Sequence, residues 1–357
     1  MHSGRPLVAV KCKLGELDAL GNLRSRRDAQ VRVMVELLDS TSPSGRLLPS
    51  LVRAATSLAR FGRTLWLDTT WLTSRSPLIQ QPRGVFEYLD ACIESAVENE
   101  HGLFASHLPS LVPVISLDAS NDELRRARRL IEHKYRDIAI RIRYPARSKR
   151  DLGKRIESIM RSTGTQPGQV HAVVDAGFIE TIQASHVTST ANVAATTLDL
   201  LGPGHTTLLA GSIPKVRATY ATVLRDRPEV TLWNEIHQDG TRELNYGDYG
   251  VTHPTPSMTG GNARSPFPYL CYTVPQKTVV LRRKQEKGDL PAELFADLVE
   301  ELVERDDFAG PDYSWGDSEL ARCRHAGGRT AGSVSRWVAM ATSHHLEHVS
   351  RRTATDL

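Results

Sequence analysis

The sequence has few cysteines and no long apolar run. Cys12, Cys92, Cys271 and Cys323 are scattered along the chain and form no CxxC pair, which argues against a zinc knuckle or a disulfide scaffold. No stretch of about 18 apolar residues occurs, so we predict no membrane-spanning helix. Because no apolar signal region precedes a cleavage site, we expect a cytoplasmic protein.

Common signatures of catalysis are also missing. The sequence contains no GxGxxG, GxxxxGK[ST] or HExxH motif. It therefore offers no motif evidence for a nucleotide-binding loop or for a zinc-protease helix. Nine of the 45 basic residues are lysines. An arginine excess can reflect binding of carboxylate or phosphate, because the guanidinium donates two parallel hydrogen bonds to such groups. GC-rich coding explains an arginine excess equally well. The 357 residues, 40% hydrophobic and 24% charged, suit a globular protein, but composition names neither a reaction nor a cofactor.

Short apolar runs alternate with stretches of helical periodicity over the first 250 residues. The predicted strands are at residues 6–13, 31–38, 64–69, 111–118, 138–143, 170–175 and 206–212, with a less regular eighth at 243–248. Helical patterns lie between most of them, and residues 216–224 are a further helix candidate. Such alternation calls for parallel strands joined by right-handed crossovers. Seven or eight units fit a TIM-like (β/α)8 barrel better than an open doubly wound sheet, although periodicity cannot detect closure.

A second region follows, and we predict an α+β structure appended to the barrel. Its predicted elements are a long loop, a hairpin or edge strand pair and two helices, at residues 252–267, 269–283, 291–304 and 333–349. The organisation we predict is a barrel over residues 1–250, a C-terminal region packed on it over 251–350, and a disordered tail over 351–357.

Strand parity predicts which side chains point into the barrel. In residues 138–143, isoleucines alternate with Ala139, Arg141 and Arg143, and successive side chains of a strand point to opposite faces. The outer face of a barrel packs against helices and must be apolar, so we expect the two arginines in the lumen. The same argument on other strands adds four charged residues, namely Lys11, Glu36, Asp68 and Asp175.

These six charged residues lie at or near the C-terminal ends of strands, where barrel enzymes build their active sites. Three cations and three carboxylates in a partly dry volume must pair, because an unpaired buried charge costs several kcal/mol. One interpretation is therefore a structural ion-pair network. The other is a catalytic site, in which the carboxylates act as acid, base or metal ligands and the cations hold an anionic group. The spacing itself predicts no particular metal site.

The turn after the seventh strand is a candidate binding site. Ser212 and Lys215 occupy it, and the loop after a late barrel strand is a common seat for phosphate. The alternative is a plain strand-to-helix turn in which Pro214 starts the helix.

The C-terminal region adds Trp315, His344 and His345 as candidate binding residues. Trp315 is expected in the core of this region, because large aromatic side chains usually bury their area there. His344 and His348 are four residues apart, a spacing that can chelate a metal, but no Glu stands between them in the zinc-protease position. A capping, packing or partner-contact role is therefore favoured.

A strongly basic stretch runs over residues 125–161. Arg125, Arg126, Arg128 and Arg129 lie on one predicted outer helix, and such a face can follow a phosphate backbone. The alternative is a solvated helix face with local ion pairs. Interleaved aromatic residues, which would support stacking of a single strand, are missing.

Several short motifs occur in order along nearly the whole chain. They are Lys13-Leu-Gly-Glu16 after the strand with Lys11, Asp175, Ser212-Ile-Pro214, Tyr313-Ser-Trp-Gly-Asp317, Gly328, Trp337 and His344-His345. In these residues the chain resembles the beta protein family, named for a protein of a T-even bacteriophage and found widely in bacteria. The resemblance implies a barrel-like α/β fold and, because relatives tend to lie near phage-conflict genes, a role in defence or counter-defence. It implies no settled activity and hence no catalytic residue.

Two functional hypotheses follow, and whether the protein is an enzyme stays open. In the first, the barrel is a recognition module that binds a phage component, a companion defence protein or nucleic acid. In the second, it is a hydrolase or lyase acting on a phosphate-bearing substrate at the C-terminal mouth of the barrel. The hypotheses differ in whether the lumen charges line an open pocket or are paired and sealed.

Overall fold

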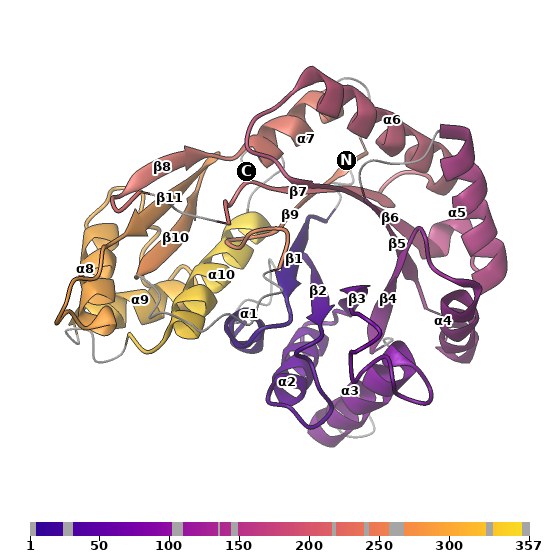
Figure 1. Ribbon diagram of the computed structural model, residues 1–357, viewed down its shortest axis with the longest axis horizontal. Coiled ribbons are helices and arrows are strands. Elements are labelled where there is room, and N and C mark those ends of the chain that lie inside the picture. The colour runs from indigo at the N-terminus through magenta and orange to yellow at the C-terminus, as the bar shows by residue number, and fades with distance from the viewer. Residues whose placement is uncertain are drawn as a thin grey trace.

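Eight parallel strands form a closed barrel at the centre of the computed structural model (Figure 1). The structure describes residues 5–23, 31–101, 110–134, 136–143, 149–215, 219–238, 243–256, 268–325 and 331–351. In ring order the strands are β1 (Leu7–Lys11), β2 (Arg32–Leu38), β3 (Leu65–Trp71), β4 (Leu111–Ser116), β5 (Ile138–Arg143), β6 (Val170–Phe178), β7 (Thr206–Gly211) and β9 (Asn245–Asp248). Because β9 pairs in parallel with both β7 and β1, it supplies the eighth strand, and the predicted (β/α)8 fold class is confirmed.

Helices connect the strands and cover the outside of the barrel (Figure 1). They are α1 (Leu14–Gly21), α2 (Leu47–Ala59), α3 (Val85–His101), α4 (Asn121–Lys134), α5 (Lys149–Thr163), α6 (Ala184–Leu201) and α7 (Pro228–Gln238), with a short 3-10 turn at Pro167–Gln169. The start of α4 shows how local sequence fixes a helix end. The Ser120 hydroxyl accepts from the Glu123 backbone N–H, and the Glu123 carboxylate accepts from the Ser120 N–H, a reciprocal arrangement that satisfies amides without helical partners.

Alternate residues of each strand face the lumen, as the parity argument predicts. The interior cluster consists of Leu7, Ala9, Met34, Trp66, Val112, Val114, Ala139, Val173, Leu209 and Tyr249. Residues of opposite parity, such as Val8, Val35 and Ile140, pack outward against the helices. The lumen is thus filled by side chains, and its charged residues sit above this apolar layer.

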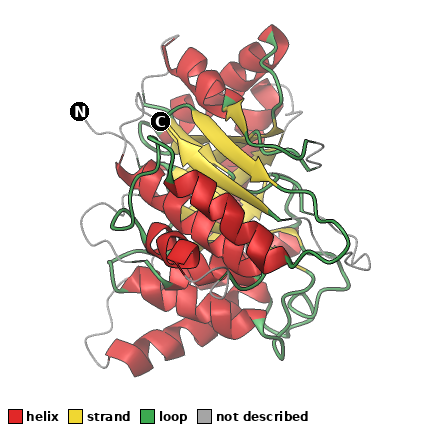
Figure 2. Ribbon diagram, turned by 90° about the vertical axis from the view of Figure 1, so that its left-hand side faces the viewer, coloured by secondary structure: helices red, strands yellow, loops and turns green. Residues whose placement is uncertain are grey.

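A smaller antiparallel sheet lies beside the barrel, with strand order β10 (Tyr269–Val274), β11 (Lys277–Arg282) and β8 (Val223–Asp226). Figure 2, viewed from this side, shows helices packed around its strands. These helices are α8 (Pro291–Val303), α9 (Trp315–His325) and α10 (Val334–Arg351). The predicted hairpin at 269–283 thus corresponds to β10 and β11.

The prediction of a helix at residues 216–224 is wrong where the structure describes it, and residues 216–218 lie outside the described ranges. Val223–Asp226 is an edge strand paired with β11. A four-residue strand is stabilised by its neighbour, which lies some fifty residues away in the sequence and leaves no local signal. This strand comes from the range that we assigned to the barrel but belongs to the second sheet. The predicted tail, after Arg351, also lies outside the described ranges.

Helix α10 belongs to both apolar cores. Leu346 and Val349 pack with the outer layer of the barrel, whereas Trp337 and Met340 pack with the second sheet. Two glycines let neighbouring helices approach it: a Cβ on Gly15 or on Gly316 would lie 2.4 or 2.1 Å from a backbone oxygen of α10. Helix α10 therefore joins the C-terminal region to the barrel.

Candidate functional site

Arg141 is the centre of the polar cluster in the lumen, and β5 directs it inward. Its Nη1 lies 2.7 Å from Glu36 Oε1 and also pairs with Asp68. Its Nε and Nη2 lie 3.0 and 2.8 Å from Asp175 Oδ2, and Nη2 donates to the hydroxyl of Tyr249 at 2.6 Å. One guanidinium thus binds three carboxylates and a phenol from β2, β3, β6 and the end of β9.

The partners of Arg141 are themselves held in place. Lys11 Nζ lies 2.5 Å from Glu36 Oε2, and the indole N–H of Trp71 donates to Glu36 Oε1 at 2.8 Å. The Thr70 backbone N–H and hydroxyl both donate to Asp68 Oδ1. We call Lys11, Glu36, Asp68, Arg141, Asp175 and Tyr249 the Arg141 network.

Asp175 is fixed by groups on both sides of its carboxylate. The Tyr249 hydroxyl donates to Asp175 Oδ1 at 2.6 Å, and the backbone N–H of Gly177 donates to the same oxygen at 2.9 Å. Gly177 has a φ of +68°, a conformation that a residue without Cβ adopts without strain. The turn after Asp175 therefore bends back onto the carboxylate.

Every member of the Arg141 network is shielded from solvent, with exposed fractions of 2% or less. Burial alone would raise the pKa of Glu36, but the ion pairs with Lys11 and Arg141 outweigh it and lower that pKa. Burial raises the pKa of Asp68, and Arg141 offsets this only in part. Burial also raises the pKa of Tyr249, which keeps its hydroxyl a hydrogen-bond donor.

Arg143, predicted alongside Arg141, takes a different position. Its side chain is 44% exposed, its Nε lies 3.4 Å from Asp175 Oδ2, and its guanidinium stacks 4.4 Å from the centre of the Trp71 ring. It therefore covers the network from the C-terminal rim. With Arg143 included, cations and carboxylates number three each, and each of the three cations lies beside at least one carboxylate.

The turn after β7 is anchored to the second sheet. Ser212 is buried and Lys215 is exposed, while Ile213 between them packs into the core of the second sheet. Through Lys215 the described chain forms no helix, so the prediction that Pro214 starts one is wrong there. Apolar anchoring of Ile213 by the second sheet directs the chain away from a standard strand-to-helix turn.

His344 and His345 link three parts of the molecule. His345 Nε2 lies 2.8 Å from Asp248 Oδ1 of β9, and its Nδ1 lies 2.7 Å from the Thr273 hydroxyl of β10. His344 Nδ1 lies 3.0 Å from the Asp317 carboxylate, and its Nε2 lies 2.8 Å from the Thr273 carbonyl. Both rings are buried, so they hold α10 to the barrel and to the second sheet.

Trp315 opens α9 and packs, half-buried, against the core of the second sheet, with the Arg336 guanidinium 5.9 Å from its ring centre. His348 lies within the same helix as His344, with their ring centres 6.0 Å apart. Within the described ranges no group of three or more His, Cys, Asp and Glu side chains is arranged to hold a metal ion. The contacts that the structure shows for Trp315, His344 and His345 are packing and bridging contacts.

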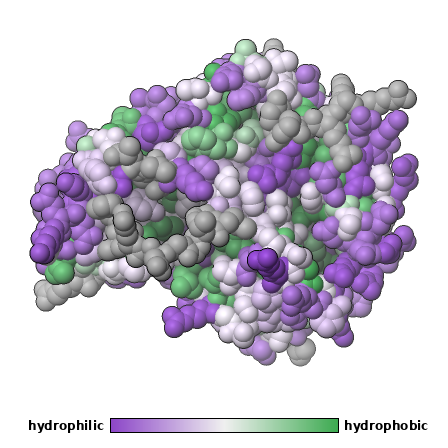
Figure 3. Space-filling view, in the orientation of Figure 1, coloured by the Kyte–Doolittle hydropathy of each residue, from purple (hydrophilic) through white to green (hydrophobic). Residues whose placement is uncertain are grey.

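The four arginines of α4 are exposed on the outer surface. Arg125 pairs with Asp122, and Arg128 Nε lies 2.7 Å from Glu132 Oε1. Arg126 reaches toward Gly84, at the start of α3. The face is therefore a solvated one with local ion pairs, but it keeps an excess of positive charge. Figure 3 shows the side of the molecule that α4 and α5 cover as mostly hydrophilic.

Sequence reasoning missed the residues that complete these sites. Tyr249 lies in the irregular end of the last strand, where parity was not applied, although continuing the alternation from Asn245 would have placed it inward. Asp248 points outward and binds Arg227 Nη2 at 2.9 Å and the Tyr246 hydroxyl at 2.7 Å. Burial alone would raise the pKa of Asp248, but His345 and Arg227 lower it. Arg227 and His345 lie 21 and 97 residues from Asp248 in the sequence, so no local pattern predicts these two contacts.

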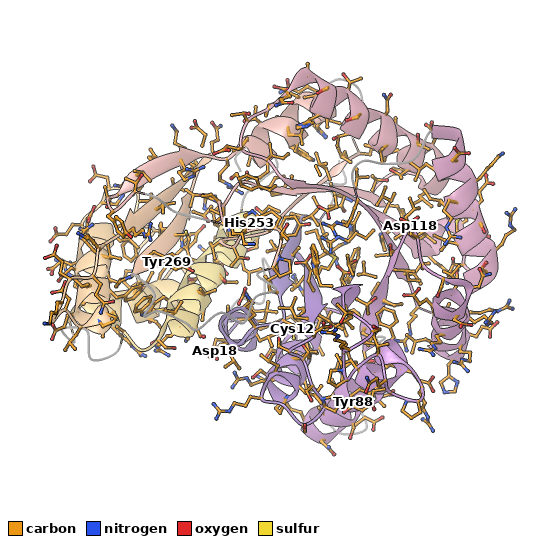
Figure 4. The ribbon with its side chains drawn as sticks, in the orientation of Figure 1. Cys12, Asp18, Tyr88, Asp118, His253 and Tyr269 are labelled. Atoms are coloured by element: carbon orange, nitrogen blue, oxygen red, sulfur yellow. The ribbon has the colours of Figure 1, made fainter. Side chains whose placement is uncertain are left out.

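Two buried titratable groups lie next to the network at the start of α1. Burial raises the pKa of Glu16 to about 7, against the nearby cations Lys13 and Lys11. Burial raises the pKa of the Cys12 thiol to about 12, which leaves it protonated and unreactive near neutral pH. Figure 4 labels Cys12 beside β1, on the barrel side, with Tyr269 in the second sheet.

None of the described helices is long and apolar enough to cross a membrane.

Together these features define a closed parallel (β/α)8 barrel with a buried ion network at its C-terminal end. The chain belongs to the Beta protein family, whose model matches residues 5–351. No curated protein sequence matches it. Among solved structures it is similar to Haloferax volcanii malate synthase in a lead(II) complex, with 12% identity, a TM-score of 0.38, and coverage of 92% of this chain and 90% of that one.

It is also similar to a Coccidioides immitis protein assigned as a fructose-1,6-biphosphate aldolase, with 10% identity and a TM-score of 0.36. That match covers 97% of this chain and 94% of the other. Similarities at this level say nothing about activity. The strand order of the closed barrel defines the fold class without them.

Proposed function

We propose that this protein acts by recognition in a phage-conflict system, in defence or counter-defence, and that its partner is nucleic acid bound on the outer face of α4 and α5. The observation that carries the proposal is the state of the lumen. Its charges are paired with one another, and all but Arg143 at the rim are shielded from solvent, so the shielded ones hold the barrel together and are closed to a substrate.

The excess positive charge of the chain lies in two adjacent helices. Helix α4 has five Lys or Arg against three Asp or Glu, and α5 has five against two, whereas the net charge of the whole chain is +4. The two helices together therefore carry a net charge of +5, and the rest of the chain carries a net charge of −1. A surface with this bias favours the phosphate backbone, whose counterions are released on binding.

A matched pair of variants tests the proposal. The Arg125, Arg126, Arg128 and Arg129 to Gln variant removes four exposed charges from α4, and the Arg46, Arg53, Arg75 and Arg322 to Gln variant removes four exposed charges elsewhere. Duplex DNA binding by the wild type should weaken with salt at a log–log slope of about −0.9 per phosphate contacted. The α4 variant should flatten that slope and lose phage protection or counter-protection, while the control keeps both.

Wild-type protein that fails to bind duplex DNA or RNA at low salt would refute the nucleic-acid partner. Loss of the phage phenotype in the α4 variant without any nucleic-acid binding would point to a phage or companion protein on the same face. An unchanged phenotype in both variants would refute the surface altogether.

A second candidate function, a hydrolase or lyase acting on a phosphate-bearing substrate, is supported by Arg143. This arginine is 44% exposed at the C-terminal rim, where a phosphate could reach it. Asp175→Asn, beneath it, separates the two functions. If the network is structural, the variant should lose stability, on the order of 3 kcal/mol, and keep its phage phenotype when assayed below its melting temperature. Loss of the phenotype without loss of stability would favour the enzyme.

A further inference from the structure

The opposite, N-terminal end of the lumen holds a second polar cluster. Arg5 precedes β1, Arg32 begins β2 and Arg63 precedes β3, so three arginines meet at the starts of three adjacent strands. Trp66 and His171 face the lumen beside them, with ring centres 5.1 Å apart. We call these five residues the Arg32 cluster.

Contacts connect the members of the cluster. The Arg32 guanidinium lies 5.6 Å from the centre of the Trp66 ring, and Arg63 Nη1 donates to the carbonyl of Val31, next to Arg32, at 2.9 Å. His171 Nε2 lies 3.3 Å from Asp137 Oδ2, and its ring stacks on that of His205. Trp66 therefore separates the Arg32 guanidinium and the His171 imidazole from the apolar layer above.

The charge of this cluster is not matched. Burial lowers the pKa of Arg32 to about 10, with Arg5 lowering it further and Asp137 acting in the opposite direction. Burial and Arg5 together lower the pKa of Arg63 to about 10. Asp137 is the carboxylate that acts on Arg32, and it also lies 3.3 Å from His171 Nε2. Burial disfavours the charged form of an arginine, and a neighbouring cation such as Arg5 disfavours it further.

Two buried nitrogen atoms in the cluster have no hydrogen-bond partner among the described residues. These atoms are Arg32 Nη1 and His171 Nδ1. His171 is 8% exposed as a residue, and its side chain is 11% exposed. A buried donor or acceptor left without a partner costs about 1–3 kcal/mol, and more when it is charged. Arg63 has a hydrogen-bond acceptor in the Val31 carbonyl, whereas Arg32 Nη1 and His171 Nδ1 have no partner among the described residues.

We propose that the N-terminal end of the lumen binds a small oxyanion, phosphate-like or carboxylate-like, between Arg32 and His171 under Trp66, with Arg5 and Arg63 as the surrounding positive charge. The anion supplies the acceptor that Arg32 Nη1 lacks and neutralises the excess charge. This site lies at the end of the barrel opposite to the Arg141 network and is independent of the proposed function.

Binding takes up a proton at His171. Its Nε2 faces the Asp137 carboxylate, an acceptor, so Nε2 carries hydrogen and Nδ1 of the neutral ring has a lone pair. Burial, Arg32 and His205 all lower the pKa of His171, against the hydrogen bond to Asp137. An oxyanion at Nδ1 favours the doubly protonated ring, and the proton comes from solvent. Affinity should therefore rise as pH falls from 7.5 to 5.5, by up to about tenfold per unit.

Sulfate is the first probe, because it keeps its charge over this pH range. Titrating sulfate at constant ionic strength in chloride, with calorimetry and with NMR of the His171 ring, should show saturable binding that tightens toward low pH. Phosphate and acetate, titrated separately at pH 6, distinguish a tetrahedral from a planar anion. Arg32→Gln should weaken sulfate binding at least tenfold, whereas Arg125→Gln, which removes one exposed positive charge on α4, should leave it unchanged.

His171→Asn provides a second variant should Arg32→Gln fold poorly. It should keep weakened binding and lose the pH dependence, because Asn cannot take up the proton. The proposal is overturned if the His171 signals do not respond to any of the three anions, or if Arg32→Gln and Arg125→Gln weaken binding equally. Neither result bears on nucleic-acid binding by α4 and α5.

Discussion

The two ends of the barrel lumen differ in how their charges are balanced. At the C-terminal end, Arg141 is surrounded by three carboxylates and a phenol. Each of these partners also makes a hydrogen bond or ion pair with a further residue of the site. At the N-terminal end, Asp137 acts on Arg32, Arg5 adds positive charge beside Arg32 and Arg63, and Arg32 keeps a buried nitrogen without an acceptor among the described residues. Position in a (β/α)8 barrel favours the C-terminal end as the functional one, but here the charges of that end are paired with one another, and Lys11 Nζ and Glu36 Oε2, which have no other hydrogen-bond partner among the described residues, form an ion pair.

The difference teaches that a cluster of charged residues in a lumen is not by itself a site. A complete network stabilises the fold and excludes ligand, because adding a charge would leave a group unpaired. An incomplete cluster has a missing component of definite chemistry. Four experiments can break or sharpen this contrast.

The largest effect is expected on removing the central arginine of each end. Arg141→Ala should reduce the free energy of unfolding by about 3–5 kcal/mol, because three buried carboxylates then face one another. Arg32→Ala should cost no more than about 1 kcal/mol in anion-free buffer, since it loses a cation–π contact but relieves repulsion from Arg5. Urea denaturation of both variants measures this. Similar losses for the two would show that the ends are built alike.

A smaller effect separates two carboxylates within the Arg141 network. Glu36→Gln should destabilise the protein by about 3 kcal/mol at pH 7, because it leaves Lys11 and Arg141 short of an anion. The matched Asp68→Asn variant should cost at most about 1 kcal/mol, since burial already disfavours the charged form of Asp68 and the amide oxygen still accepts from Thr70. Equal costs would contradict this assignment of charge.

Glu36 and Asp68 should also affect the pH dependence of the free energy of unfolding, and their effects should have opposite signs. The folded pKa of Glu36 is lowered, so its contribution is complete above the unfolded value of about 4.3 and is lost as pH falls through the folded value. The folded pKa of Asp68 is raised, so its contribution is present at low pH and fades as pH rises through the folded value. Stability of Glu36→Gln should therefore fall less than that of wild type on acidification. A steeper fall would refute the assignment.

The smallest effect is a shift in a single titration. In anion-free buffer, Arg32→Gln should raise the pKa of His171, because a neighbouring cation that opposes its protonation is gone. NMR of the His171 ring follows the titration, with His186 as an internal reference, because His186 follows the C-terminal end of β6 whereas His171 lies at the start of that strand. A downward or absent shift would mean that the two side chains do not share one electrostatic environment.

Much of this architecture is predictable from local pattern. The alternation in residues 138–143 places Ile140 outward and Arg141 inward, and the structure agrees. Strand and helix order also follow from periodicity, because apolar spacing reflects which face each element buries. Where stabilisation comes from a distant partner, as for Val223–Asp226 against β11, the local pattern predicts the wrong element.

The sequence by itself determined the barrel, the lumen-facing identity of its charged residues and the basic bias of α4 and α5, since all three depend on spacing along one element. Only the tertiary structure decided that Arg141 is saturated by Tyr249 and three carboxylates, that Arg143 stays at the rim, and that Arg32 lacks an acceptor. Charge balance depends on distances between strands far apart in the sequence and on the removal of water, and periodicity carries no information about either.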